Sequence, residues 1–304
     1  MSLSLFLLQL LNGLQFGMVL FLVAAGLTLI FGVMDFINLA HVVQYTLGAY
    51  LTAICVAYFG HFGLGLAVGL AGALALGFLL EFLLFGVLMH RSHLEQVLGT
   101  FGVILIVTDG LKMIFGPAPL ALMVPEAFQR SVMLTPTLAY PAWRLAIMVA
   151  GGVLALALWW LVTKTRVGML VRAGSTDRET VSALGVDIDR LFRLVFAFGA
   201  VLAAFAGAMA GPLVSIEPTM GDSILILAFV VIVVGGIGSM RGAFLAALLI
   251  GVVDTLGRAF LTGLLANVVG KAAAASVGPS LASMLIYILM ALVLAVRPQG
   301  LFAR

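Results

Sequence analysis

The chain has 304 residues, of which 64% are hydrophobic and 9% charged, and its mean hydropathy is +1.28. An ordinary soluble domain is about half apolar and about a quarter charged, so this composition excludes a water-soluble globule and an intrinsically disordered chain. The 15 Lys and Arg residues outnumber the 12 Asp and Glu residues, which gives a net charge of +3. In so apolar a chain a basic surplus is typical of cytoplasmic loops between spans, and no nucleic-acid partner is expected.

Nine apolar runs follow one another along the chain, and most reach or approach the roughly 20 residues that a helix needs to cross a bilayer. They cover residues 5–33, 42–59, 64–89, 97–115, 145–162, 191–214, 224–234, 243–256 and 281–296. The seventh run is short, and the eighth can extend to Leu261. Unbroken runs do not fit the alternating pattern of an outer-membrane barrel. We therefore expect one all-α polytopic membrane domain over residues 1–304, with 8–9 transmembrane helices, some of them short or broken.

The distribution of basic residues predicts the orientation. Six of them lie within residues 164–193, the most basic segment of the chain, and the positive-inside tendency places this segment in the cytoplasm. Counting spans from there puts ten basic residues inside and four outside, Arg258 included, with Lys112 within a span. The N-terminus is then expected outside and the C-terminus inside. No cleavable signal peptide is expected, because the first basic residue is Arg91.

Two long loops stand out between the apolar runs. The outer loop, over about 116–144, carries five of the nine prolines and is expected to be irregular, because proline fixes φ and lacks an amide donor. In the inner loop, over about 164–192, Ser175 or Thr176 can cap a short helix that Gly185 ends. This helix either covers the cytoplasmic face of the bundle or is a rigid element that a soluble partner pushes. Charge alone does not decide between the two.

A cluster of glycines, Gly235, Gly236 and Gly238 before Ser239, interrupts the apolar sequence at the end of the seventh run. Irregular backbone at membrane depth is tolerated only where it is buried in protein or faces a cavity. The cluster is compatible with a bend near a transport pathway or with a tight turn between two half-length spans. We favour the turn.

Ionisable residues within spans are costly and are therefore candidates for function. Asp109 and Lys112 are three residues apart and share a helix face, so they are expected to neutralise each other. We favour an internal ion pair that fixes helix packing over a transport role. Asp254 can pair in the same way with Arg258, and Glu81 with one of the basic residues near it.

The sequence shows no residues arranged for enzymatic or metal chemistry. His41, His90 and His93 lack the compact spacing of a metal site, and Cys55 is the only cysteine. No Ser–His–Asp or Cys–His set is apparent, so we expect no catalytic residue and no metal. The sequence also lacks the GxxxxGK[ST] phosphate-binding motif, so this chain is not expected to hydrolyse ATP by itself.

Three groups of short motifs occur in order along nearly the whole chain. The first is GLTLIFGV at residues 26–33, NLAH at 38–41 and LGAY at 47–50. The second is TRxG at 165–168, RA at 172–173, Asp177 and ALGVD at 183–187. The third is GGIGS at 235–239, Gly242 and RPQGLF at 297–302. With these motifs the chain resembles the permease subunits of branched-chain amino acid ABC importers, of the shorter of two related types.

The resemblance implies an ATP-driven importer in the lipid of a bacterial inner membrane, with a periplasmic N-terminus and a cytoplasmic C-terminus. The chain would pair with a second, related permease, and a periplasmic binding protein would deliver the solute. Two cytoplasmic ATPase subunits would supply the ATP–Mg chemistry, while this chain would bind no cofactor. Val42 stands where the family usually has Gly, and relatives carry amides, urea or aromatic acids, so the solute stays open.

The resemblance also implies roles for two sets of residues in an alternating-access cycle. The inner loop would couple the ATPases to the permease pair through Arg172, Ala173, Asp177, Glu179 and Gly185. The translocation path would be lined or gated by Asn38, His41, Gly235, Gly236, Gly238 and Ser239.

Two other functions stay open. A stand-alone secondary transporter or channel would need an intramembrane ion site, for which Asp109 and Lys112 are the candidates. A membrane-embedded enzyme or redox subunit would need clustered titratable groups or cofactor ligands at membrane depth.

Overall fold

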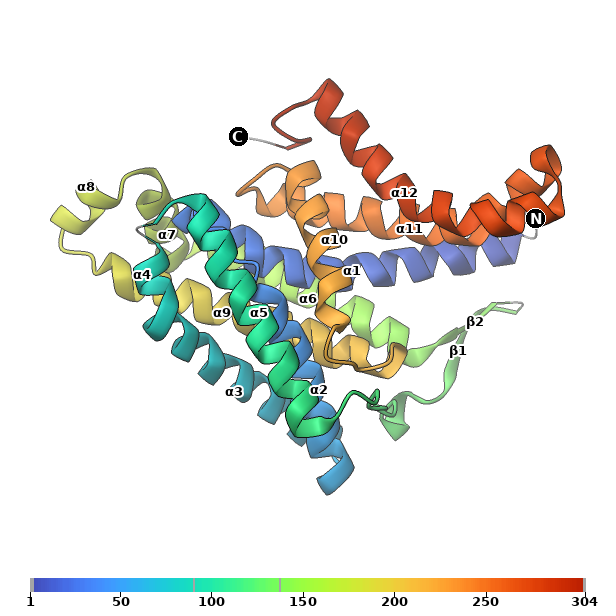
Figure 1. Ribbon diagram of the computed structural model, residues 1–304, viewed down its shortest axis with the longest axis horizontal. Coiled ribbons are helices and arrows are strands. Elements are labelled where there is room, and N and C mark those ends of the chain that lie inside the picture. Colours follow the sequence, from blue (N-terminus) through green and yellow to red (C-terminus); the bar gives the residue numbers. More distant parts are fainter. Residues whose placement is uncertain (1–2, 90, 137, 303–304) are drawn as a thin grey trace. The chain divides into compact units, whose positions relative to one another are not determined.

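The computed structural model describes residues 3–89, 91–136 and 138–302, and most of them are helical (Figure 1). Within this part of the chain eight helices are long and apolar enough to span a membrane. They are α1 (Leu3–Met34), α2 (His41–Phe59), α3 (Phe62–Leu80), α5 (His93–Phe115), α6 (Ala142–Lys164), α9 (Ile188–Ala210), α11 (Met240–Val269) and α12 (Lys271–Val296). A ninth apolar helix, α10 (Met220–Gly235), is shorter. The predicted all-α polytopic membrane protein with 8–9 spans is confirmed.

One predicted span is broken and another is longer than expected. In the third run, α3 gives way to a π-helical turn over Glu81–Phe85 and then to the short α4 (Gly86–Leu88), a break of the kind expected for some spans. The wider π turn interrupts the regular hydrogen-bond ladder and shifts the helix face that follows. The eighth run continues far beyond its predicted end, so Arg258 lies inside α11 and not in an outer loop. Its Nε donates to Asp254 Oδ1 at 2.8 Å, the pair that the four-residue spacing predicted.

The outer loop is more regular than expected. It contains a 3₁₀ turn (Glu126–Phe128) and a hairpin of β1 (Ser131–Thr135) and β2 (Leu138–Pro141). The two strands are antiparallel, with Ser131 opposite Pro141 and an irregularity between Met133 and Thr135. Proline does not disrupt this pairing, because Pro141 is at the end of its strand, where a missing donor is tolerated.

The chain divides into two compact units, which are described separately. Unit 1 comprises the residues up to 21, 124–153 and the residues from 229 onward. In unit 1, α11 and α12 pack side by side (Figure 1). The first half of α1 packs on α11 with its backbone in close contact: a Cβ on Gly17 would lie 2.8 Å from the carbonyl oxygen of Ala247. Glycine on α1 therefore lets these two helices approach closely.

Unit 2 comprises residues 22–123 and 154–228, and its core is α2 packed against both α3 and α9, which also touch each other. The buried face of α3 consists largely of small residues at four-residue steps, Gly65, Gly69, Ala73 and Gly77. On α2, Gly48 is so close to α9 that a Cβ there would lie 2.5 Å from the Cα of Ala204. Helix α2 is therefore in backbone contact with both α3 and α9, with little side-chain volume between them.

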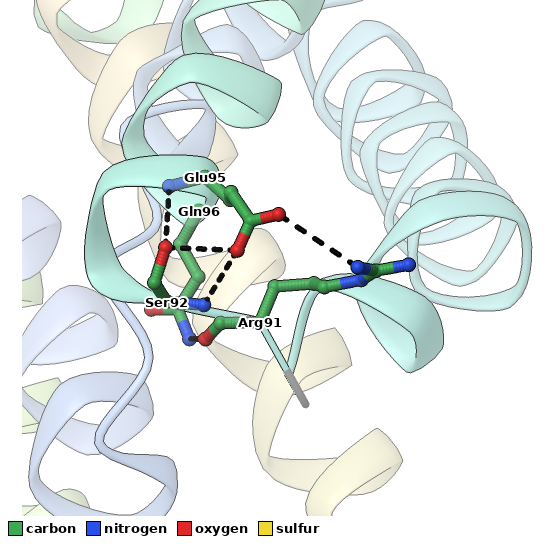
Figure 2. A network of polar contacts seen from close by, with 4 residues as sticks. All are labelled: Arg91, Ser92, Glu95 and Gln96. Atoms are coloured by element: carbon green, nitrogen blue, oxygen red, sulfur yellow. Dashed lines mark hydrogen bonds and ion pairs between the residues drawn. The ribbon is translucent and has the colours of Figure 1, made fainter.

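The start of α5 is fixed by a network of local polar contacts. Figure 2 shows a capping box, in which the Glu95 amide donates to Ser92 Oγ at 3.4 Å and the Ser92 amide donates to Glu95 Oε2 at 2.9 Å. Arg91 pairs with the same carboxylate at 3.8 Å. Gln96 Nε2 donates to the Arg91 carbonyl oxygen at 3.2 Å, which leaves the Gln96 side-chain oxygen to accept hydrogen bonds elsewhere.

Candidate functional site

The α1–α2 junction, residues 35–40, is held by one face of α5. The amide of Ile37 donates to Gln96 Oε1 and the amide of Leu39 donates to Thr100 Oγ1, both at 3.2 Å. Gln96 and Thr100 are four residues apart, so they lie one helical turn apart on the same face. This face of α5 therefore positions the backbone on both sides of Asn38.

The residue that directly follows α1 adopts an unusual backbone conformation. Asp35 has φ +50°, and among the described residues no other non-glycine side chain has a positive φ. Aspartate tolerates this left-handed region better than most residues, because its short polar side chain can bond locally. The chain thereby turns abruptly out of α1, and Phe36 and Asn38 become buried, each with 1% exposure.

A stripe of polar side chains continues from this junction along α2. His41, Gln44 and Thr52, with Gly48 between them, are three or four residues apart and so share one helix face. All three polar side chains are at most 1% exposed. We call His41, Gln44 and Thr52, together with Asn38, the polar stripe.

The polar stripe runs through the core of unit 2. A Cβ on Gly26 of α1 would lie 2.7 Å from His41 Nε2, so the imidazole touches the backbone of α1. A Cβ on Gly69 of α3 would lie 2.5 Å from Thr52 Oγ1. The stripe therefore faces closely packed backbone of α1 and α3, and not solvent.

The polar atoms of this stripe have few partners. Neither side-chain polar atom of Asn38 or of Gln44 has a hydrogen-bond partner within the described chain, and the same holds for Thr52 Oγ1. His41 has a weak contact with the Val23 backbone, but neither ring nitrogen makes a well-formed hydrogen bond. An unsatisfied buried polar group costs about 1–3 kcal/mol. So many of them on one face make the polar stripe a candidate site for binding a polar solute.

The inner loop forms two short helices. Helix α7 (Arg166–Thr176) is capped by Thr165, whose Oγ1 accepts from the Gly168 amide at 3.1 Å. Helix α8 (Arg178–Ala183) is capped by Asp177, whose Oδ1 accepts from the Thr180 amide at 3.0 Å. Gly185 ends it with φ +86°. The predicted short helix ended by Gly185 is therefore confirmed.

The predicted cap of that helix was wrong. Ser175 and Thr176 belong to the last turn of α7, where both hydroxyls donate to the Arg172 carbonyl oxygen. Arg172 itself donates from its guanidinium to the carbonyl oxygen of Val162 at the end of α6. These bonds keep the two hydroxyls within α7, so the break between the helices falls at Asp177. The side chain of Glu179 lies outside the described residues.

Arg178, at the start of α8, was not predicted as a site residue. Its Nη2 donates to the Met34 carbonyl oxygen at 2.5 Å, and its guanidinium carbon lies 4.7 Å from the centroid of the Phe192 ring. A cavity of about 630 Å³ lies beside it, lined by Arg178 and Ser182 of α8 and by residues that include Glu81 and Arg193. Arg193 pairs with Glu81 at 3.8 Å, which identifies the basic partner of that carboxylate.

The glycine cluster forms a turn, as favoured from the sequence. Helix α10 ends at Gly235 and α11 begins at Met240, with Gly236 and Gly238 at φ +97° and +76°. Ser239 Oγ caps α11 by accepting from the Gly242 amide at 3.1 Å. The expectation of two half-length spans holds for α10 alone, because α11 has 30 residues.

The C-terminal segment closes over this turn. The Leu301 amide donates to the Val234 carbonyl oxygen at 2.8 Å, and the Phe302 amide donates to the Gly235 carbonyl oxygen at 3.2 Å. These bonds satisfy carbonyl groups at the end of α10 that have no intrahelical partner. Two motifs that are about 60 residues apart in the sequence therefore stabilise one turn.

Asp109 and Lys112 form the predicted ion pair, with Nζ 3.0 Å from Oδ1. The pair is not internal to the chain, because the two side chains are 67% and 42% exposed. Within the described residues no group of three His, Cys, Asp or Glu could hold a metal ion.

A family model described as "branched-chain amino acid transport system / permease component" matches residues 9–294. The chain belongs to this permease family. Among the relatives of this permease, the high-affinity branched-chain amino acid transport system permease protein LivH of Escherichia coli is 28% identical over 259 residues, which cover 81% of this chain and 83% of LivH. The corresponding protein BraD of Pseudomonas aeruginosa is 27% identical and covers 97% of this chain and 95% of its own. The fructose import permease protein FrcC of Rhizobium meliloti is 31% identical over 100 residues, 31% of this chain and 28% of its own. No solved structure matches the permease.

The structure brings together some of the residues predicted for the permease. Asn38 and His41 lie in one buried region of unit 2, and Gln44, Thr52, Gln96 and Thr100 join them. Gln44 and Thr52 carried a sequence signal, because they repeat at helical spacing from His41 within an apolar run. Gln96 and Thr100 carried none that pointed to the junction, since they are about 60 residues away from it.

Proposed function

We propose that this multi-pass membrane permease is one of two related membrane subunits of an ATP-driven importer for branched-chain amino acids or a chemically similar small solute. The family match over residues 9–294 carries the proposal, and the eight candidate spans are in keeping with it. In this assembly two cytoplasmic ATPase subunits bind and hydrolyse ATP–Mg, and a periplasmic binding protein delivers the solute. The permease itself holds no cofactor and performs no catalysis.

The orientation in this proposal follows the basic residues. Helices α7 and α8 lie in the cytoplasm within the most basic segment, the N-terminus is periplasmic and the C-terminus cytoplasmic. The two helices are suited to receive a soluble partner because each has its own cap and most of α8 is exposed. We assign Arg172, Ala173, Asp177, Glu179 and Gly185 to this ATPase-coupling element.

The polar stripe is the best-supported part of the translocation path. Its amide, imidazole and hydroxyl groups supply both donors and acceptors without a net charge. Such a set suits a dipolar solute, for example the ammonium and carboxylate of an amino acid, and the closely packed helices around it would have to separate for the solute to pass. In this proposal the Gly235–Ser239 turn gates the path through its position at the end of α10, where the Gly235 carbonyl oxygen is bonded to the C-terminal segment.

A co-purification and reconstitution experiment tests the function. The tagged permease is isolated from native membranes in mild detergent, its partners are identified by mass spectrometry, and the complex is reconstituted with ATP inside vesicles. We expect a second permease and P-loop ATPases, and leucine uptake that requires ATP and the binding protein. Uptake should vanish when the phosphate-binding lysine of the ATPase is replaced. A lone chain or homo-oligomer that carries solute without ATP would instead establish a secondary transporter or channel.

A further inference from the structure

We propose that Arg178 is a positioning residue that transmits movement of α8 to the α1–α2 junction, residues 35–40, and through it to the polar stripe. This inference rests on the proposed function, in which the ATPases move α8. It assigns to Arg178 a role that neither the family match nor the sequence motifs contain.

Arg178 links α8 to the end of α1. Arg178 Nη2 donates to the Met34 carbonyl oxygen at 2.5 Å, and Met34 is the last residue of α1. Carbonyls in the last turn of a helix have no intrahelical partner and carry the negative end of the helix dipole. A guanidinium at this position is therefore held by a charge-assisted hydrogen bond and by the dipole together.

The Arg178 side chain also contacts α9. Its guanidinium carbon lies 4.7 Å from the Phe192 ring centroid, a cation–π geometry. The planar guanidinium can stack on a ring and donate in its own plane at the same time, which an ammonium cannot do. One residue of α8 therefore touches the ends of two spanning helices.

Apart from Arg178, α8 makes few buried contacts with the rest of the unit. Of its residues whose side chains are described, Val181 alone is buried, at 7% exposure. The cavity of about 630 Å³ beside α8 leaves space on the side that faces Glu81 and Arg193. Helix α8 can therefore shift without repacking a core, and its displacement reaches α1 through Arg178.

The end of α1 sets the position of the first residues of the polar stripe. The backbone turns at Asp35, with φ +50°, directly after the carbonyl that Arg178 holds. Asn38 follows three residues later, between the two amides that α5 fixes. A pull on the Met34 carbonyl therefore acts on a turned segment whose far side is anchored, and its effect falls on Asn38 and His41.

The experiment compares Arg178→Gln and Arg178→Lys with Arg91→Gln in the reconstituted complex with its ATPases and binding protein. Arg91, just before α5, is a matched control. Its guanidinium pairs with the exposed Glu95, and in the described contacts it bonds to no backbone carbonyl. The readouts are recovery of the complex, ATP hydrolysis, leucine uptake per ATP, and thiol labelling of Asn38→Cys with and without ATP and vanadate. The reporter is placed in a Cys55→Ala background, and Leu39→Cys serves as a second reporter.

Arg178→Gln should leave assembly and ATP hydrolysis intact while uptake per ATP falls about tenfold, which corresponds to about 1.4 kcal/mol of coupling. The ATP-dependent change in labelling at position 38 should disappear with it. Arg178→Lys should be intermediate, since it keeps the charge but not the stacking, and Arg91→Gln should resemble the parent protein.

Parental uptake per ATP and parental labelling in Arg178→Gln would overturn the inference. A parallel loss of recovery, hydrolysis and uptake would also overturn it, because Arg178 would then only stabilise the fold. If the unsubstituted complex shows no ATP-dependent uptake, the proposed function fails first, and this outcome is distinguishable from the other two.

Discussion

The polar stripe on α2 and the helix pair α7–α8 differ in what holds them in place. The stripe is buried, its backbone surroundings come from α1, α3 and α9, and most of its polar atoms have no partner in the described chain. In the helix pair α8 is largely exposed and α7 is partly exposed, and each helix is capped by the residue just before it. The stripe thus depends on tertiary packing, whereas the helix pair depends mainly on local hydrogen bonds.

This difference suits the two proposed roles. A segment that must present unpaired polar groups to a solute can keep them only if rigid packing prevents them from finding each other. A segment that must shift when a soluble partner moves benefits from few buried contacts. The following predictions test whether packing governs the first region and capping the second.

The largest effect is expected from Gly48→Ala on the packed side. The added Cβ would lie 2.5 Å from the Cα of Ala204, so α2 and α9 must separate. Overpacking of this kind costs about 1–3 kcal/mol and occasionally more, and we expect a lower melting temperature and poor recovery in detergent. Gly63→Ala is the matched control, because a Cβ there meets nothing within 4 Å. Equal melting temperatures for the two variants would show that the α2–α9 contact is not tight.

Gln44→Leu should separate function from stability. It removes two buried polar atoms that have no partner, so the free energy of unfolding should rise by about 1–2 kcal/mol. Leucine uptake should fall at the same time, because the solute loses polar contacts. Thr46→Val is the control on the same helix, since its hydroxyl already donates to the Val42 carbonyl oxygen at 3.3 Å. A destabilised Gln44→Leu with parental uptake per molecule would contradict a place in the path.

Asp177→Ala should affect the coupling element alone. Loss of a helix cap costs about 1 kcal/mol, and here it frays α8 without disturbing a core, so the melting temperature should stay unchanged. Uptake per ATP should fall several-fold. Ser175→Ala, which removes a hydroxyl that caps nothing and bonds within α7, should leave uptake as it is. If the serine variant proves the more damaging, the cap has been assigned to the wrong residue.

The smallest effect is expected at Asp109 and Lys112. An exposed ion pair contributes about 0–1 kcal/mol, and replacing both residues by Leu should leave uptake and melting nearly unchanged. Each single replacement should cost more, because it leaves one charge unpaired within a span. Equal loss of uptake in the double and both single variants would instead support a direct role in transport.

The same distinction explains how much the sequence could predict. The spans, the turn at Gly236 and Gly238, and the end of α8 at Gly185 follow from local residue properties, and the structure confirms them. The partners of the α1–α2 junction could not be predicted, because Arg178 and Met34 are 144 residues apart and Ile37 and Gln96 are 59 apart.

One further difference has a local cause. Ser175 or Thr176 was predicted to cap α8, but both hydroxyls bond back within α7, and Asp177 caps α8 instead. The sequence was compatible with either arrangement, because serine, threonine and aspartate are all good N-cap residues.

The backbone contact between α2 and α9 has a mechanical consequence. Where Gly48 meets Ala204, the two helices touch backbone to backbone, with no flexible side chain between them to absorb a sliding motion. We therefore expect them to tilt together. Since α9 has 23 residues, its length is about 34 Å at 1.5 Å per residue, and a tilt of about 5° at one end displaces the other by about 3 Å. A displacement of that size, about the diameter of a water molecule, is produced at the far end without breaking any contact between the two helices.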